Sequence, residues 1–352
     1  MPRHLSATGL GSVGMVLAGP ALAQTTSPAL TPLTPEQWPM NFWSSAGAQG
    51  DAINGLLWGL IWLSVIVVVI IALLVIVGII VRGARGREVA TTPVERSGNG
   101  VGFIYIGVGI STLVLVVYTG WTVATMAGIA SPPSAPGLTI DVTGHQWWWE
   151  FRYENPDTSQ VFLTANEIHI PVGVPVHFRL QTADVIHSFW IPALGGKTDM
   201  IPGRVNEMWL EADKAGIYRG QCSEYCGEQH AQMALRVVAD TPSDFAAWRD
   251  AQLADPVQPV TDEARLGATR FQLRCGACHT VRGTPAGGAV GPDLSHLMSR
   301  TTIAAGMLQN NAANLGGWIA NPQSIKPGAQ MPNIELSGPE LHAIETYLLT
   351  LG

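Results

Sequence analysis

Two long runs of uncharged residues constrain the fold of this chain more than any other feature of its sequence. Residues 52–81 carry no charge and consist mainly of Leu, Ile and Val, and a second run of this kind covers 101–129. About 20 apolar residues suffice for a helix to cross a bilayer. We therefore predict transmembrane helices over 53–81 and 101–129. The alternative, two buried helices of a large soluble core, is disfavoured by their length.

The charges beside the two runs predict which side of the membrane each segment occupies. The loop 82–100 contains four arginines, whereas the segment 24–52 contains neither Lys nor Arg. Positively charged loops remain on the cytoplasmic side of a membrane. We expect 82–100 to be a cytoplasmic loop, 24–52 to be a periplasmic N-terminal segment, and all residues after the second helix to face the periplasm.

The first 23 residues have the pattern of a secretory signal. A basic start at Arg3 precedes a short apolar core, and Ala21 and Ala23 place small residues where a signal peptidase reads them. We expect residues 1–23 to be a cleaved signal peptide; an uncleaved N-terminus is the alternative. Together with the two helices, this predicts a two-pass protein of the bacterial plasma (inner) membrane.

Composition excludes several classes of function. Only 13% of the 352 residues are charged, about half of the usual share, so the lipid bilayer is an expected partner. The formal net charge is −7 and no basic run is long, so we expect no nucleic-acid partner. The four cysteines all lie in two short motifs, which leaves none for structural disulfide bonds.

Two more domains are expected after the second helix. Residues 138–240 alternate between apolar and polar, with Pro and Gly at short intervals, which predicts an antiparallel β-barrel or sandwich. A short helix extends this domain to 138–253, and 254–261 is interpreted as a linker. Residues 262–352 change to helical periodicity. The expected fold is a multi-domain membrane protein: a two-helix transmembrane hairpin, an antiparallel β-barrel and a small all-α domain.

One cysteine motif carries the ligands of a soft metal. The run from Cys222 to Met233 reads CSEYCGEQHAQM and contains two thiols, an imidazole and a thioether. Such ligands favour copper, and two thiolates can bridge a pair of metals. His187, which follows a predicted strand, is the best candidate for a second imidazole. A structural zinc site is the alternative, but a thioether is not among the usual ligands of zinc.

Residues 138–240 resemble the CuA domain of subunit II of haem–copper cytochrome c oxidases, a cupredoxin-like Greek-key barrel. The resemblance rests on GHQWWW at 144–149, DVIHS at 184–188, KTDMIPGR at 197–204 and the run 222–233. It implies a dinuclear copper site with these ligands: His187, Cys222, the backbone carbonyl of Glu224, Cys226, His230 and Met233.

The same resemblance implies further roles. The side chain of Glu224 would bind magnesium at the boundary with subunit I, and Trp147 would be the aromatic residue at which electrons arrive. Packing in the core or at the membrane interface is the alternative for Trp147. We interpret Asp184 as a solvated charge for donor docking rather than as a ligand. Many members carry a glutamate for proton uptake shortly before the second helix; residues 99–105 contain none, so the sequence gives no support for that role.

The second cysteine motif fits the signature of c-type haem attachment. It reads Cys275-Gly-Ala-Cys278-His279, in which both thiols would bind the haem covalently and His279 would ligate the iron. A dithiol redox pair or half of a zinc ribbon is the alternative. No second cysteine pair is free to complete a ribbon.

A methionine is expected on the far side of the iron. Met331 is preferred, because its segment resembles the axial-methionine segment of class I cytochromes c, just before the last predicted helix. Met307 and Met298 follow in that order. We interpret His296, a rival ligand, as a solvated loop histidine.

The whole chain resembles subunit II of a caa-type cytochrome c oxidase, in which a cytochrome c domain follows the CuA domain. This implies electron transfer from a soluble cytochrome c donor through covalent haem c to CuA, and on to the oxygen-reducing centre of subunit I, with subunits I and III as partners. The chain itself would hold only electron-transfer sites of a proton-translocating enzyme complex.

Three alternatives remain for the function. A quinol oxidase subunit would lack the copper ligands that are present here. A CuA-bearing subunit of another haem–copper reductase, acting on nitric oxide, would have them. A free-standing, membrane-anchored periplasmic electron carrier would have no catalytic partner.

Overall fold

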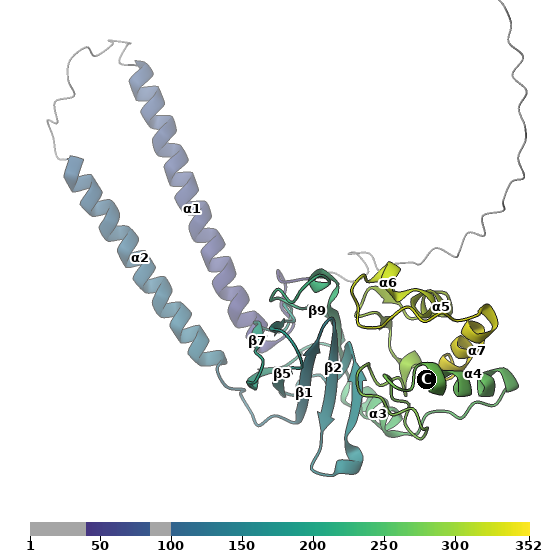
Figure 1. Cartoon of the computed structure of the whole chain (residues 1–352). Helices are drawn as coiled ribbons and strands as arrows, with labels where there is room; N and C mark the ends of the chain where they lie inside the picture. The colour runs from purple at the N-terminus through teal and green to yellow at the C-terminus, as the bar shows by residue number, and fades with distance from the viewer. Residues whose placement is uncertain (1–39, 85–99) are drawn as a thin grey trace, which may run out of the picture.

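The computed structural model describes residues 40–84 and 100–352 of the chain. The expected signal peptide lies outside the described residues, as do the arginines of the expected cytoplasmic loop beyond Arg82. Two long helices project from a body that consists of a β-sandwich and a helical domain (Figure 1). The helical domain lies on the opposite side of the sandwich from the two long helices.

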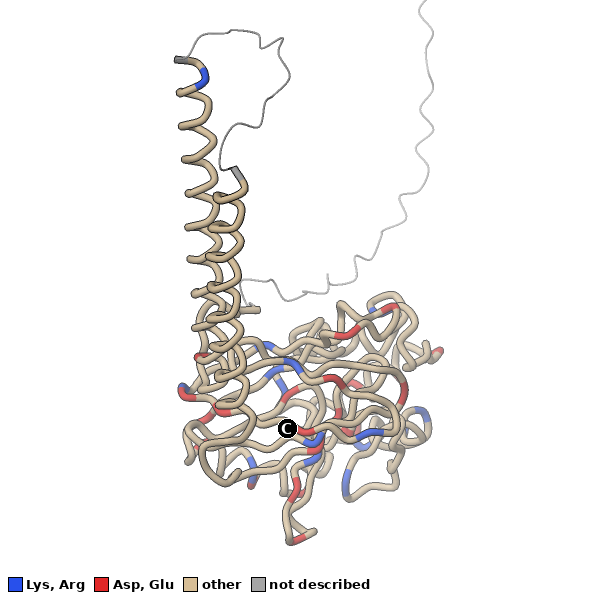
Figure 2. Tube along the Cα trace, turned by 90° about the vertical axis from the view of Figure 1, so that its left-hand side faces the viewer, with Lys and Arg blue, Asp and Glu red and all other residues tan. Residues whose placement is uncertain are grey.

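The two apolar runs form α1 (Ala48–Ala84) and α2 (Gly100–Ile129). α1 begins inside the segment expected to precede the first span, because the Gly50 N–H donates to the Leu194 carbonyl and docks this end on the sandwich. Both helices are long and apolar enough to cross a membrane, and their apolar windows are not buried by the rest of the chain. Figure 2 shows the charged residues gathered on the globular body and at the far end of α1.

One tryptophan of the sandwich ties both long helices to it. The indole N–H of Trp209 donates to the carbonyl of Ile129, the last residue of α2, at 2.9 Å. The amide of Gln49, in the first turn of α1, donates to the Trp209 carbonyl, also at 2.9 Å. Between the helices, the Tyr118 hydroxyl donates to the Leu56 carbonyl at 2.5 Å. The hairpin is therefore fixed to the body at its base.

The sandwich consists of two main sheets, with strand orders β3-β2-β1-β5-β8 and β4-β10-β9, and a separate β6-β7 pair. The strands are β1 (Leu138–His145), β2 (Trp148–Glu154), β3 (Phe162–Ala165), β4 (Glu167–Pro171), β5 (Val176–Thr182), β6 (His187–Phe189), β7 (Thr198–Met200), β8 (Asn206–Leu210), β9 (Gly216–Gln221) and β10 (Ala234–Asp240). The prediction of a β-domain that is a barrel or a sandwich is confirmed, and its core is built on fully buried aromatic side chains such as Trp149, Phe151 and Phe189.

The pairing within these sheets is not antiparallel throughout, as the sequence pattern had suggested. β1 runs parallel to β5, and β4 runs parallel to β10. Apolar alternation identifies the buried face of a strand but carries no information on the direction of its neighbour. A crossing connection between the sheets, which alternation cannot detect, makes these two pairs parallel.

Helix α3 (Pro242–Leu253) closes the sandwich domain. The Thr241 side chain caps its first turn. Trp248 of α3 stacks on the His169 ring of β4, with the ring centroids 4.2 Å apart and the planes at 11°. This contact fixes the point from which the following segment departs toward the helical domain.

The C-terminal domain is helical, with a two-strand ribbon. Its elements are α4 (Asp262–Arg274), β11 (Thr302–Ile303), β12 (Leu308–Gln309), α5 (Ala312–Ala320), α6 (Pro322–Ile325) and α7 (Gly338–Leu348). The Thr261 and Ser337 side chains cap α4 and α7. The two helices cross where Gly267 faces the Ala343 carbonyl, so closely that a Cβ would collide with it. Glycine is required at this crossing by the approach of the backbones.

Candidate copper site and haem cavity

A pair of sulfur atoms lies at one end of the sandwich. Cys222 directly follows β9, and its Sγ lies 3.8 Å from the Sγ of Cys226. The Nδ1 of His187, in the first residue of β6, lies 3.8 Å from the Cys222 Sγ. The Nδ1 of His230 lies 3.5 Å from the Cys226 Sγ. Two chain segments far apart in sequence thus place one imidazole beside each sulfur.

Two weaker donors complete the cluster. The Sδ of Met233 lies 3.9 Å from the Cys226 Sγ, and its side chain is fully buried. The backbone carbonyl of Glu224 lies 3.2 Å from the Cys222 Sγ. All six residues predicted from the sequence therefore meet around the sulfur pair. This is a CuA-type donor set. A zinc site would not need the Met233 thioether or the Glu224 carbonyl.

Electrostatics of the cluster favour a thiolate, the form of cysteine that binds metals. The hydrogen bond with Cys226 lowers the pKa of Cys222 to about 4, although burial opposes this shift. The same hydrogen bond raises the pKa of Cys226, because two adjacent thiolates would repel one another. Metal binding to the pair would release the proton that remains on Cys226.

Asp184 has a different position from the one that the sequence suggested. Its carboxylate is partly buried, and its Oδ1 lies 2.8 Å from the Nε2 of His187. Its Oδ2 accepts a hydrogen bond of 2.6 Å from the Gln146 backbone N–H. Asp184 is thus not a free charge in solvent, whereas its role in donor docking stays a prediction. Asp184 orients the His187 ring so that Nδ1 faces the sulfur pair, an arrangement typical of metal-binding histidines.

The turn between β1 and β2 packs onto the cysteine loop. Both the Trp147 indole N–H and the Gln146 side-chain amide donate to the Cys226 carbonyl, at 3.0 Å and 2.7 Å. Gly227 has a φ of +117°, and a Cβ there would lie 3.0 Å from the Trp147 ring. Trp147 is only 9% exposed, because the C-terminal domain covers it.

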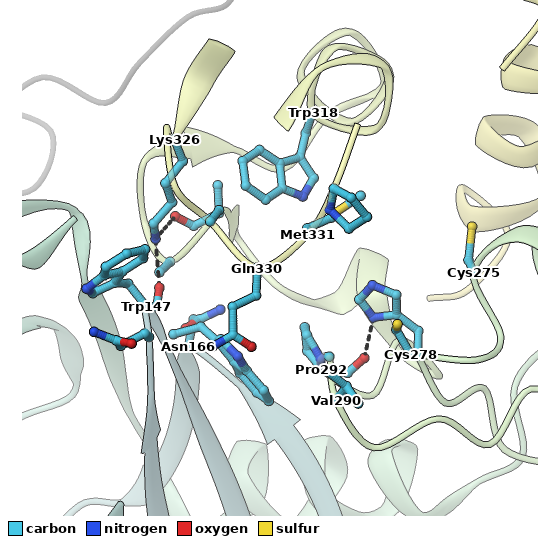
Figure 3. Close-up of a pocket in the computed structure, with 18 of the residues that line it drawn as sticks. Trp147, Asn166, Cys275, Cys278, Val290, Pro292, Trp318, Lys326, Gln330 and Met331 are labelled. Carbon is cyan, nitrogen blue, oxygen red and sulfur yellow. Dashed lines mark hydrogen bonds between the residues drawn. The ribbon is translucent and has the colours of Figure 1, made fainter. Parts of the chain in front are cut away.

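The second cysteine motif borders a cavity that reaches Trp147. Cys275 follows α4, and the cavity walls include Cys278, His279 and Met331. Figure 3 shows Met331 and Trp318 on one side of this cavity and Cys278 with Pro292 on the other. A second cavity continues past Met331 toward Leu348 of α7. Together they form a largely apolar slot bounded by the attachment motif.

The chemistry of the slot fits a covalent haem. The Nδ1 of His279 lies 2.9 Å from the Pro292 carbonyl, which leaves Nε2 for iron. Burial lowers the pKa of His279, which favours the neutral imidazole that ligates metals. A Cβ on Gly291 would lie 2.6 Å from the His279 ring, so glycine is required for the ring's position. Burial raises the pKa of Cys275 to about 11, which disfavours the dithiol redox alternative.

The other candidates for the far side of the iron lie elsewhere. Met331 borders both cavities, whereas Met298 and Met307 pack at the edge of the helical core. His296 is 6% exposed and lies against Arg282 and the Ala254 carbonyl. The interpretation of His296 as a solvated loop residue is therefore wrong: it holds the start of the linker.

Sequence reasoning missed three residues of this region. Gln146 supports the Cys226 carbonyl, Lys326 lies between the two sites, and Arg300 borders the second cavity. Gln146 is adjacent to Trp147 in the predicted motif and could have been suspected. Lys326 has no local pattern, since its partner Trp147 lies 179 positions away in the sequence. Arg300 donates to the nearby Asp293 carbonyl, but a backbone acceptor gives no sequence signal.

These features define a membrane-anchored chain with a CuA-type site and a cytochrome c domain. Residues 157–240 match the family model "Cytochrome C oxidase subunit II, periplasmic domain", and residues 264–352 match the model "Cytochrome c". The chain therefore contains a region similar to the periplasmic domain of cytochrome c oxidase subunit II, followed by a region similar to cytochrome c.

Several individual proteins are similar to this chain. Cytochrome c oxidase subunit 2 of Alkalihalophilus pseudofirmus is 43% identical over 214 residues, which cover 60% of each chain. The protein of the same name from Bacillus sp. strain PS3 is 35% identical over 61% of this chain and 62% of its own length. A solved periplasmic domain of subunit II of cytochrome oxidase of Bradyrhizobium japonicum is 37% identical over 34% of this chain and 95% of its own, with a TM-score of 0.32. The matched region spans about 60% of the length of the first two relatives.

Proposed function

We propose that this chain is subunit II of an aerobic terminal cytochrome c oxidase, which receives electrons from a cytochrome c donor and delivers them to subunit I. Covalent haem c and dinuclear copper would supply the one-electron redox chemistry. Cys275, Cys278, His279 and Met331 would hold the haem. The copper ligands would be His187, Cys222, the Glu224 carbonyl, Cys226, His230 and Met233.

The position of Trp147 is the observation that supports this function most directly. Its indole donates to the Cys226 carbonyl, while its ring borders the haem cavity. A single aromatic side chain therefore contacts both sites, which favours electron transfer between them. Because the C-terminal domain covers Trp147, we expect a soluble donor to meet the haem domain and not the sandwich.

Three finer assignments belong to this proposal. The Glu224 carboxylate, which pairs with Lys197 at 3.5 Å, would bind magnesium at the boundary with subunit I. Subunits I and III would be the membrane partners of α1 and α2. Both domains would face the periplasm from a bacterial plasma membrane, with the N-terminus on the same side.

The first test is a metal count on the full chain, matured with haem and loaded with copper. We expect two coppers per covalent haem and an electron paramagnetic resonance spectrum in which both coppers share one unpaired electron equally. One zinc or one isolated copper per chain would contradict the copper assignment.

A second test separates the proposal from its alternatives. Affinity purification from membranes of the native cell should co-isolate a many-span haem protein, and the complex should reduce oxygen. Isolation of the chain alone would favour a free-standing carrier, and turnover of nitric oxide instead of oxygen would favour a different reductase.

A further inference from the structure

A buried lysine lies between the two candidate sites. Lys326 follows α6 in the cytochrome domain and is only 3% exposed. Its Nζ donates to the carbonyls of Trp147 at 2.7 Å, Gln232 at 2.8 Å and Ala304 at 3.3 Å. Figure 3 shows the Lys326 side chain reaching Trp147 at the edge of the cavity.

The three acceptors come from three different parts of the molecule. Trp147 lies in the β1–β2 turn that packs on the cysteine loop. Gln232 directly precedes Met233 of the sulfur cluster. Ala304 belongs to the cytochrome domain and borders the haem cavity. One ammonium group thus joins the β1–β2 turn, the metal-ligand loop and the wall of the haem cavity.

The hydrogen-bonding capacity of the Lys326 ammonium group explains why it stabilises the contact between the two domains. An ammonium group has three N–H donors and no acceptor, so three carbonyls match it fully. Among the described residues Lys326 forms no ion pair, so the three carbonyls are the hydrogen-bond partners of its ammonium group. Burial lowers the pKa of Lys326 to about 7, and a negative charge on the Cys226 sulfur opposes this shift. A displacement of one domain against the other would break the hydrogen bonds to the Trp147 and Gln232 carbonyls, which is costly as long as these groups stay buried.

The residues after Lys326 extend the same contact. The Gln229 side chain, one residue before His230, donates to the Pro327 carbonyl at 2.8 Å. Gly328 adopts a φ of +79°, and a Cβ there would lie 2.8 Å from the Glu228 carboxylate. The segment then continues to Met331 in the haem cavity. One short segment therefore touches the copper loop and also supplies the candidate axial ligand.

We propose that Lys326 is a positioning residue that fixes the haem cavity relative to the sulfur pair and thereby sets the rate of electron transfer between them. This inference rests on the proposed function, because it requires electrons to move between the two sites. It assigns to Lys326 neither a ligand role nor a contact with the donor.

The test compares Lys326→Met with wild type in the full chain, loaded with haem and copper. Haem is reduced by a light pulse, and oxidation of the haem is followed together with reduction of the copper site. We expect transfer in Lys326→Met to slow by about tenfold or more, the factor that a loss of ~1.4 kcal/mol produces. Lys326→Gln, which keeps two N–H donors, should give an intermediate rate. Lys214→Met, on the exposed surface, should leave the rate unchanged.

Two further readouts separate positioning from damage to either site. The haem absorbance and the copper resonance should stay at their wild-type form, while protease cleavage within the linker 254–261 should increase. Loss of the copper resonance in both Lys326 variants, or transfer at the wild-type rate in Lys326→Met, would overturn the inference. If Lys326→Met fails to fold, a wild-type rate in Lys326→Gln overturns it as well. Absence of transfer in the wild type would overturn the proposed function, and this inference with it.

Discussion

Cys226 connects the sulfur cluster to its surroundings through two different atoms. Its Sγ lies within 4 Å of Cys222, His230 and Met233. Its carbonyl oxygen accepts from Trp147 and the neighbouring glutamine. The same residue is therefore both a candidate ligand and the anchor of the turn that covers the cluster.

At the residue scale, the first prediction concerns Asp184. Asp184→Asn removes the carboxylate that orients His187 and should weaken copper affinity by about tenfold, as loss of a hydrogen-bond partner of a ligating histidine generally does. The measurement is competition for copper against a chelator of known affinity. Asp250→Asn, on the exposed surface of α3, is the matched control. Equal affinities in both variants would rule out the orienting role.

The second prediction concerns the far side of the haem iron. Met331→Leu should abolish the sulfur-to-iron absorption band and lower the reduction potential by on the order of 100 mV, within the ~0.8 V range that axial ligands span. Met298→Leu, at the edge of the helical core, should change neither. A redox titration of the full chain followed by haem absorbance makes the comparison. The assignment fails if Met298→Leu, and not Met331→Leu, removes the band.

At the scale of elements, the crossing of α4 and α7 organises the cytochrome domain. Because the helices approach closely at Gly267, Cys275 at the end of α4 packs against the same core as the buried residues of α7. The helical periodicity of each segment was visible in the sequence. The sequence did not show where the two helices cross, because a single glycine in one helix does not identify the helix that packs against it.

The third prediction tests this crossing. Gly267→Ala places a methyl group against the Ala343 carbonyl and should destabilise the domain by about 2 kcal/mol or more, as overpacking does. Gly287→Ala, where a Cβ would meet nothing within 4 Å, is the control. Thermal unfolding followed by haem absorbance gives the difference. Similar unfolding of both variants would contradict the tight crossing.

At the scale of the whole molecule, the cytochrome domain docks on the sandwich through polar contacts as well as through Lys326. Glu167 of β4 is 3% exposed and accepts hydrogen bonds from the backbone N–H and the hydroxyl of Thr301. Arg236 of β10 donates to the same hydroxyl at 2.6 Å. At the other end of the contact, the side chains of Arg282 and His296 hold the start of the linker.

The fourth prediction is a pH dependence of this docking. Burial raises the pKa of Glu167, but the nearby His169 ring and the hydrogen bonds from Thr301 outweigh burial and leave the pKa below its ordinary value of 4.5. A carboxyl whose pKa is lowered by folding contributes stability above its unfolded value and loses it as the pH falls through its folded value. Docking should therefore be constant above about pH 5 and weaken below pH 4.5.

Protease cleavage within the linker 254–261, measured from pH 6 to pH 3 with an acid-stable protease, follows this change. Glu167→Gln should show increased cleavage at pH 6 and a weaker dependence on pH, because it cannot ionise. An identical pH profile in Glu167→Gln and wild type would show that another group controls the docking.

Local patterns in the sequence determined the separate parts of this protein. The two spans, the β-domain, the helical domain and the attachment motif follow from composition, periodicity and spacing over short distances. The full set of six residues around the sulfur pair followed from the resemblance to the CuA domain. Such signals suffice because each depends on the chemistry of residues that are neighbours along the chain, or on a motif shared with known relatives.

Only the tertiary structure decided how the parts meet. The parallel strand pairs, the orientation of His187 by Asp184, the burial of Trp147 and the position of Lys326 between the two sites all join residues that are remote in the sequence. A buried lysine held by three backbone carbonyls has no sequence signature, because any residue can supply a carbonyl. Its role follows only from where the folded chain places those three oxygens.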